Sequence, residues 1–163
     1  MSYVDTSVLV AALDPEDPRL DSAKGFLEQG GYKLVSELTL VELASVIGRR
    51  SDFLADLSKR LGVDERKAAL AVLTYIIKRF NLVYKEVDSS KLVGFHRMYS
   101  PMAEAVNFSN LLKLKTLDLL HVAYMKTLKD MGEPVSEIVT VDEDFKKAEN
   151  LLKTHLDVSV RLL

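Results

Sequence analysis

The 163-residue sequence contains no cysteine. This absence excludes disulfide bridges, zinc sites built on thiolates and catalysis by a thiol. No apolar run approaches the ~20 residues that a membrane-spanning helix needs, and the first residues lack the basic and apolar pattern of a signal peptide. We therefore expect a cytoplasmic protein that does not associate with membranes.

The sequence also lacks an excess of basic residues. Its 22 Lys and Arg stand against 24 Asp and Glu, which gives a formal net charge of -2. This balance provides no overall attraction to nucleic acid or to an anionic membrane surface. A polyanionic substrate would have to be held by a local site.

Short segments rich in β-formers alternate with longer segments of helical periodicity, and 48% of the residues are hydrophobic. Strands are predicted near the start of the chain and at residues 32–35, 82–84, 138–141 and 158–162. The segments between them are predicted to be helical, including 89–99 and 102–112, separated at Ser100-Pro101, and 143–152. Because parallel neighbours need long crossovers, this alternation predicts a three-layer α/β/α domain with a mostly parallel sheet of about five strands. We expect one domain over residues 1–163, with a helical arm at about 53–80.

One carboxylate stands at the end of the first predicted strand. Asp5 follows the apolar pair Tyr3-Val4 and precedes the hydroxyls of Thr6 and Ser7. An ionised carboxylate in a buried segment loses hydration worth several kcal/mol unless donors or a cation replace the water. Open α/β sheets bind ligands at the carboxyl ends of their strands, where Asp5 would lie. The alternative is that Asp5 only caps the helix that follows.

Three further acids have the same unusual context. Glu42 is the only charged residue of the apolar segment 38–47, Asp118 is the only one of segment 116–125, and Asp142 directly follows a predicted strand. The predicted topology places these three acids and Asp5 on one edge of the sheet. Each has a simpler alternative, which is an ion pair with a nearby arginine for Glu42 and helix capping or a helix-dipole contact for the other two.

Converging carboxylates repel one another unless they are protonated or neutralised by a metal ion. Ligands that are oxygen alone favour a hard cation, Mg²⁺ or Mn²⁺, which keeps several waters and accepts substrate phosphates. A phosphodiester is therefore the expected substrate, and hydrolysis by an activated water is the expected reaction.

Four short motifs together resemble the PIN-domain nucleases, in particular the VapC-type toxins. They are Asp5-Thr6-Ser7, Val41-Glu42-Leu43-Ala44, the segment Leu117–Ala123 and the segment Thr140–Phe145. The resemblance spans Tyr3 to Phe145. It implies a PIN-like fold and a metal-dependent endoribonuclease that hydrolyses RNA.

The resemblance also implies roles for individual residues and partners. Asp5, Glu42, Asp118 and Asp142 would form the catalytic, metal-binding cluster, with Thr6 and Thr140 as supporting hydroxyls. His121, one helical turn after Asp118, would orient a metal-bound water or contact RNA, or else serve only in packing. A toxin of this family pairs with a cognate antitoxin and often forms a homodimer.

The homodimer is also suggested by an apolar stripe on the helix predicted after Asp64. Its members recur at helical spacing and exceed what one small sheet covers: Ala68, Ala69, Val72, Tyr75 and Ile76. The alternative to the nuclease is a non-catalytic PIN-fold module for RNA binding or assembly. Retention of all four acids argues against that alternative.

Overall fold

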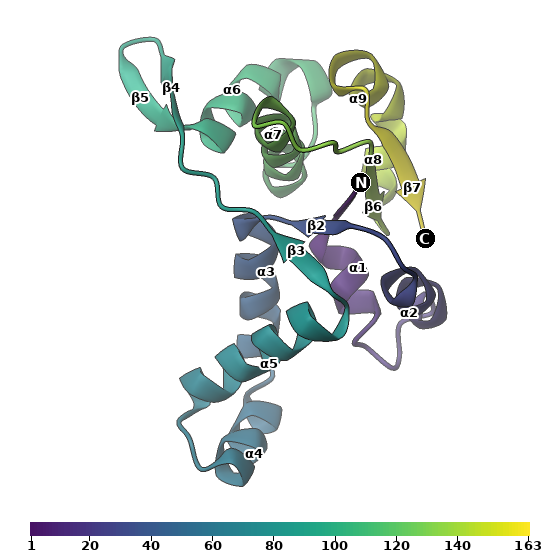
Figure 1. Cartoon of the computed structure of the whole chain (residues 1–163), viewed down its shortest axis with the longest axis vertical. Coiled ribbons are helices and arrows are strands. Elements are labelled where there is room, and N and C mark those ends of the chain that lie inside the picture. The colour runs from purple at the N-terminus through teal and green to yellow at the C-terminus, as the bar shows by residue number, and fades with distance from the viewer.

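A computed structural model describes residues 1–163 and contains a central sheet of five parallel strands (Figure 1). The strand order is β3-β2-β1-β6-β7. The strands are β1 (Ser2–Val4), β2 (Lys33–Val35), β3 (Leu82–Tyr84), β6 (Glu137–Thr140) and β7 (Ser159–Leu162). Helices cover both faces, so the predicted three-layer α/β/α fold with a five-stranded parallel sheet is confirmed.

The two faces of the sheet have separate hydrophobic cores, because consecutive strand residues point to opposite sides. Tyr3, Leu34 and Ile138 lie in one core. Their chain neighbours Val4, Val35 and Val139 lie in the other. Since both faces are buried, the strands read as continuous apolar runs in the sequence.

Helices from the first half of the chain pack on the Val4 face, below the sheet in Figure 1. They are α1 (Thr6–Ala11), α2 (Leu20–Glu28), α3 (Glu37–Gly48), α4 (Ser51–Leu61) and α5 (Glu65–Arg79). Ser36 caps α3 by accepting from the amide of Thr39, and Asp64 caps α5 by accepting from the amide of Lys67. Helix α4 and much of α5 extend beyond the sheet.

Helices from the second half pack on the Tyr3 face. They are α6 (Ser100–Leu112), α7 (Thr116–Asp130), α8 (Glu143–Lys147) and α9 (Glu149–Leu156). The single helix predicted at 143–152 is wrong, because the chain breaks between α8 and α9 at Ala148. None of the helices has the length and apolar character required to cross a bilayer.

The predicted helix at residues 89–99 is also wrong. These residues form an antiparallel hairpin of β4 (Ser90–Val93) and β5 (His96–Tyr99). Val93 pairs with His96, so the turn has two residues, and its first residue, Gly94, adopts a φ of +58°. A two-residue turn with glycine in first position favours a hairpin, and this local signal outweighs the helical spacing of the apolar residues. Pro101 then lies in the first turn of α6, where its missing amide donor costs nothing.

Candidate metal centre

The carboxyl edge of the sheet brings together acids from four parts of the chain. Asp5 follows β1, and its amide donates to the carbonyl of Val139 at 3.0 Å. Asp142 follows β6 and caps α8. Glu42 lies on α3, and Asp118 lies in the first turn of α7. The structure divides these acids into two groups, each with its own neighbours.

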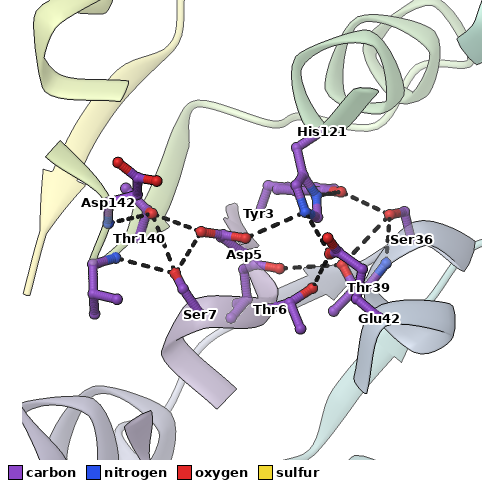
Figure 2. A network of polar contacts seen from close by, with 12 residues as sticks. Tyr3, Asp5, Thr6, Ser7, Ser36, Thr39, Glu42, His121, Thr140 and Asp142 are labelled. Carbon is purple, nitrogen blue, oxygen red and sulfur yellow. Dashed lines mark hydrogen bonds and ion pairs between the residues drawn. The ribbon is translucent and has the colours of Figure 1, made fainter. Parts of the chain in front are cut away.

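The first group, here called the histidine group, consists of Asp5, Glu42 and His121. One ligand atom of each residue lies within 4.8 Å of the others. The Nε2 of His121 is 2.9 Å from Oε2 of Glu42 and 3.3 Å from Oδ1 of Asp5 (Figure 2). Because an ionised carboxylate only accepts hydrogen bonds, Nε2 must be the donor. The imidazole thus provides one N–H between two acids.

The other ring nitrogen of His121 is also occupied. Its Nδ1 lies 2.8 Å from the hydroxyl of Tyr3, which lies 2.7 Å from the hydroxyl of Ser36. Tyr3 is completely buried and His121 is 2% exposed. This buried chain of hydrogen bonds fixes the orientation of the imidazole and therefore the position of its Nε2.

Three hydroxyls complete the histidine group (Figure 2). Ser7 and Thr140 donate to Oδ2 of Asp5 at 2.5 and 2.7 Å, and Thr6 donates to Oε2 of Glu42 at 2.5 Å. Burial alone would raise the pKa of Glu42, but the hydrogen bonds from His121 and Thr6 outweigh it and lower this pKa below its ordinary value. The carboxylate of Glu42 is therefore stabilised in its charged form.

The second group, here called the aspartate group, consists of Asp118, Asp142 and Asp144, again with ligand atoms within 4.8 Å of one another. The Oδ2 of Asp118 is buried and has no hydrogen-bond partner. Burial, followed by the negative charges of Asp142 and Asp5, raises the pKa of Asp118 to about 6. A buried oxygen without a donor, surrounded by other carboxylates, fits a divalent cation with oxygen ligands.

Asp144 was not predicted as a site residue, although it lies within the motif that begins at Thr140. Its amide donates to Oδ1 of Asp142 at 2.8 Å, so Asp142 acts as a helix cap and also faces the site. Lys115 and Lys147 lie 2.8 and 2.6 Å from the two Asp144 oxygens, and these hydrogen bonds lower the pKa of Asp144 to about 2. The signal in the sequence was its place in the first turn of the helix that Asp142 caps.

The structure therefore places every predicted site residue at this edge but does not join all four acids in one cluster. Asp5 and Glu42 share His121, whereas Asp118 and Asp142 share Asp144. Thr6 and Thr140 contact the carboxylates as hydrogen-bond donors. Tyr3 was missed as a site residue because its position in a buried strand predicts only packing.

Comparison with known proteins gives consistent results. No curated protein sequence matches this chain. The structure resembles VapC20 of Mycobacterium tuberculosis, described as a sarcin-ricin loop cleaving toxin, with 18% identity, a TM-score of 0.59 and coverage of 91% of this chain and 95% of that one.

It also resembles two VapBC structures, at 12% identity each and with coverage of 99% of this chain and 98% of theirs. VapBC2 of Rickettsia felis, bound to a DNA fragment from its promoter, gives a TM-score of 0.58, and VapBC-1 of nontypeable Haemophilus influenzae gives 0.55. At such low identities, these structural similarities show a shared fold alone. The PIN domain family model matches residues 2–151, and the chain therefore belongs to the PIN domain family.

Proposed function

We propose that this protein is a metal-dependent endoribonuclease that hydrolyses RNA phosphodiester bonds. The observation that carries the proposal is the buried, unpartnered Oδ2 of Asp118 among converging carboxylates. A structural cluster would supply donors to that oxygen, as the histidine group does for Asp5 and Glu42. Membership of the PIN domain family supports the same reaction class.

Asp118 and Asp142 would hold Mg²⁺ or Mn²⁺, together with Asp5, whose negative charge also raises the pKa of Asp118. Such an ion would neutralise phosphate charge and lower the pKa of a bound water. Glu42 and His121 would complete the catalytic cluster from the other side. The N–H of His121 holds both Glu42 and Asp5 in place. Thr6 donates to the same oxygen of Glu42, and Thr140 donates to the other oxygen of Asp5.

The biological role that fits best is that of a toxin with a cognate antitoxin. VapC20 is described as a sarcin-ricin loop cleaving toxin, and two further similar structures are of VapBC proteins. Coexpression with the product of the neighbouring reading frame tests the pairing. Growth arrest by this chain alone, relieved by coexpression, is the expected result.

We also propose a homodimer. Helices α1, α3, α4 and α5 enclose an apolar groove of about 610 Å³, lined in part by Val72, Tyr75 and Ile76 of the stripe identified in the sequence. Tyr75 and Phe53 in this groove are 62% and 52% exposed. Burial of such a surface against a second copy would remove apolar area from water. Light scattering should give twice the monomer mass, and Tyr75→Asp should shift it toward the monomer. A monomer mass at every concentration would contradict the dimer.

The nuclease is tested by incubating the protein with mixed RNA in Mg²⁺, in Mn²⁺ and in EDTA. Cleavage in the presence of either metal and none in EDTA is expected. A preparation of Asp118→Asn, purified identically, controls for a contaminating nuclease. Equal cleavage under all three conditions would exclude the metal mechanism. Binding of RNA without cleavage would instead support the non-catalytic module.

A further inference from the structure

The β4-β5 hairpin presents apolar side chains to solvent at its tip. Phe95, the second residue of the turn, is 98% exposed, and Leu92 on β4 is 71% exposed. A phenylalanine side chain that contacts nothing in its own chain does not stabilise the fold. Its position suggests that Phe95 contacts another molecule.

The hairpin is well anchored, so its tip is presented in a defined orientation. Lys91 forms ion pairs with Glu104 of α6 and Asp130 of α7. The hydroxyl of Ser89 donates to that of Ser100 at 2.8 Å. Binding of a ligand to this tip would therefore cost little conformational entropy.

The charge of the hairpin favours an anionic partner. No Asp or Glu occurs from residue 89 to residue 103, although the whole chain carries a net charge of -2. Lys91 is already paired, whereas Arg97 contacts only the hydroxyl of Ser90, at 3.3 Å. Arg97 is exposed and pairs across the hairpin with Leu92, so both side chains lie on the same face.

The base of the same face contacts the start of helix α3. Because side chains alternate along a strand, Tyr99 lies on the same face as Arg97. The hydroxyl of Tyr99 donates to Glu37 at 3.2 Å, in the first turn of α3, the helix that also carries Glu42. Figure 1 shows the hairpin projecting from the region above the start of α3.

We propose that the β4-β5 hairpin binds single-stranded RNA, with Phe95 stacking on a base and Arg97 contacting a phosphate, while the RNA strand continues to the metal centre. This proposal rests on the proposed ribonuclease function. Proteins that bind single strands without sequence preference combine aromatic rings, on which bases stack, with cationic side chains that contact the phosphates.

A protein partner fits this surface less well. A large side chain buries about 150–250 Å², so Phe95 and Leu92 together provide less than the ~800 Å² that each partner contributes to a standard interface. The isolated aromatic ring and the unpaired arginine match one nucleotide better than they match a folded surface.

The test measures binding of a fluorescent, unstructured oligoribonucleotide by anisotropy in EDTA, where no cleavage occurs. Phe95→Ala should weaken binding at least fivefold, since loss of a stacked base costs roughly 1–3 kcal/mol. Phe95→Tyr should bind like the wild type, whereas Phe95→Leu should bind like Phe95→Ala. Arg97→Ala should weaken binding and reduce the slope of log affinity against log salt by about 0.7.

Matched controls come from other surfaces of the chain. Tyr32 is 65% exposed just before β2, and Arg66 is exposed on α5. Tyr32→Ala and Arg66→Ala should leave RNA affinity unchanged. Equal losses in these controls, or unchanged affinity in Phe95→Ala, would overturn the proposal. Recovery of binding in Phe95→Leu, or a lower molecular mass of Phe95→Ala in light scattering, would indicate a protein contact and would also overturn it.

A second substrate separates this proposal from the nuclease function. Bis(p-nitrophenyl) phosphate is a phosphodiester too small to reach the hairpin, so Phe95→Ala should hydrolyse it at the wild-type rate in Mn²⁺. If the wild type and Phe95→Ala both hydrolyse this substrate and bind RNA with equal affinity, only the hairpin proposal is overturned. Hydrolysis by neither, with the loss of RNA affinity in Phe95→Ala, would remove the nuclease function and keep the hairpin as an RNA-binding surface.

Discussion

The histidine group and the aspartate group lie at one edge of the sheet, but the negative charges of their carboxylates are compensated in different ways. Asp5 and Glu42 receive hydrogen bonds from Ser7, Thr140, Thr6 and the imidazole of His121. Asp118 has a buried oxygen with no donor, and its pKa is raised to about 6. The protein therefore stabilises one half of the acidic site by itself, whereas the other half requires a cation or a proton.

The largest expected effect is on catalysis by Asp118→Asn. The substitution keeps the side-chain volume but removes an anionic ligand, so RNA cleavage should fall by orders of magnitude. In EDTA the variant should be at least as stable as the wild type, because one repulsive charge is lost. Cleavage assays in Mn²⁺ and thermal melts in EDTA measure the two effects. Glu86→Gln, at an exposed position, is the control, and wild-type cleavage by Asp118→Asn would exclude its role as a ligand.

The next effect is on stability, in the histidine group. His121→Ala leaves the carboxylates of Asp5 and Glu42 without their shared donor, and leaving a buried acceptor without its hydrogen bond costs about 1–3 kcal/mol. Urea unfolding in EDTA should show this loss. Adding Glu42→Gln should recover part of it, because an uncompensated charge is then removed. His155→Ala, at an exposed position on α9, should have no such effect, and a similarly small change in His121→Ala would mean that the imidazole does not compensate the acids.

A smaller effect concerns pH. Burial and the charges of Asp142 and Asp5 raise the pKa of Asp118, whereas the charges of Lys115 and His121 act to lower it. The folded protein therefore holds this proton more tightly than the unfolded chain. In EDTA, the stabilising contribution of the protonated form is complete below about pH 4 and is lost as the pH rises toward 6.

The metal reverses this dependence. Because a proton on Asp118 competes with the ion, Mn²⁺ should raise the melting temperature more at pH 7 than at pH 5. Melting curves of the wild type and of Asp118→Asn, with Mn²⁺ and with EDTA, measure both trends. An identical pH dependence in the two proteins would show that Asp118 does not control it.

The smallest effect is expected for Asp144→Asn. Lys115 and Lys147 already compensate this carboxylate, which makes it a weaker candidate ligand than Asp118. Cleavage should fall less than tenfold, as measured by initial rates at saturating Mn²⁺. A loss as large as that of Asp118→Asn would show that Asp144 is an essential ligand and that the two lysines do not satisfy it.

Much of the fold and the positions of the key acids follow from the sequence alone. Strands separated by helical segments predict a parallel sheet, because only a long crossover joins parallel neighbours. A lone acid in an apolar segment, as at Glu42 and Asp118, stands out because the desolvation of a charge is costly. Ser36 and Asp64 cap α3 and α5 for a similarly local reason, since their partners lie three residues away.

Only the tertiary structure decided how the acids are compensated. His121 joins Glu42, 79 residues earlier, and Tyr3, 118 residues earlier, and no local pattern specifies such contacts. The hairpin at residues 90–99 was missed because a single Gly-Phe turn competes with helical spacing over only ten residues. The residue types fixed which side chains carry charge, but packing of distant segments determined which charges received a donor and which oxygen was left without one.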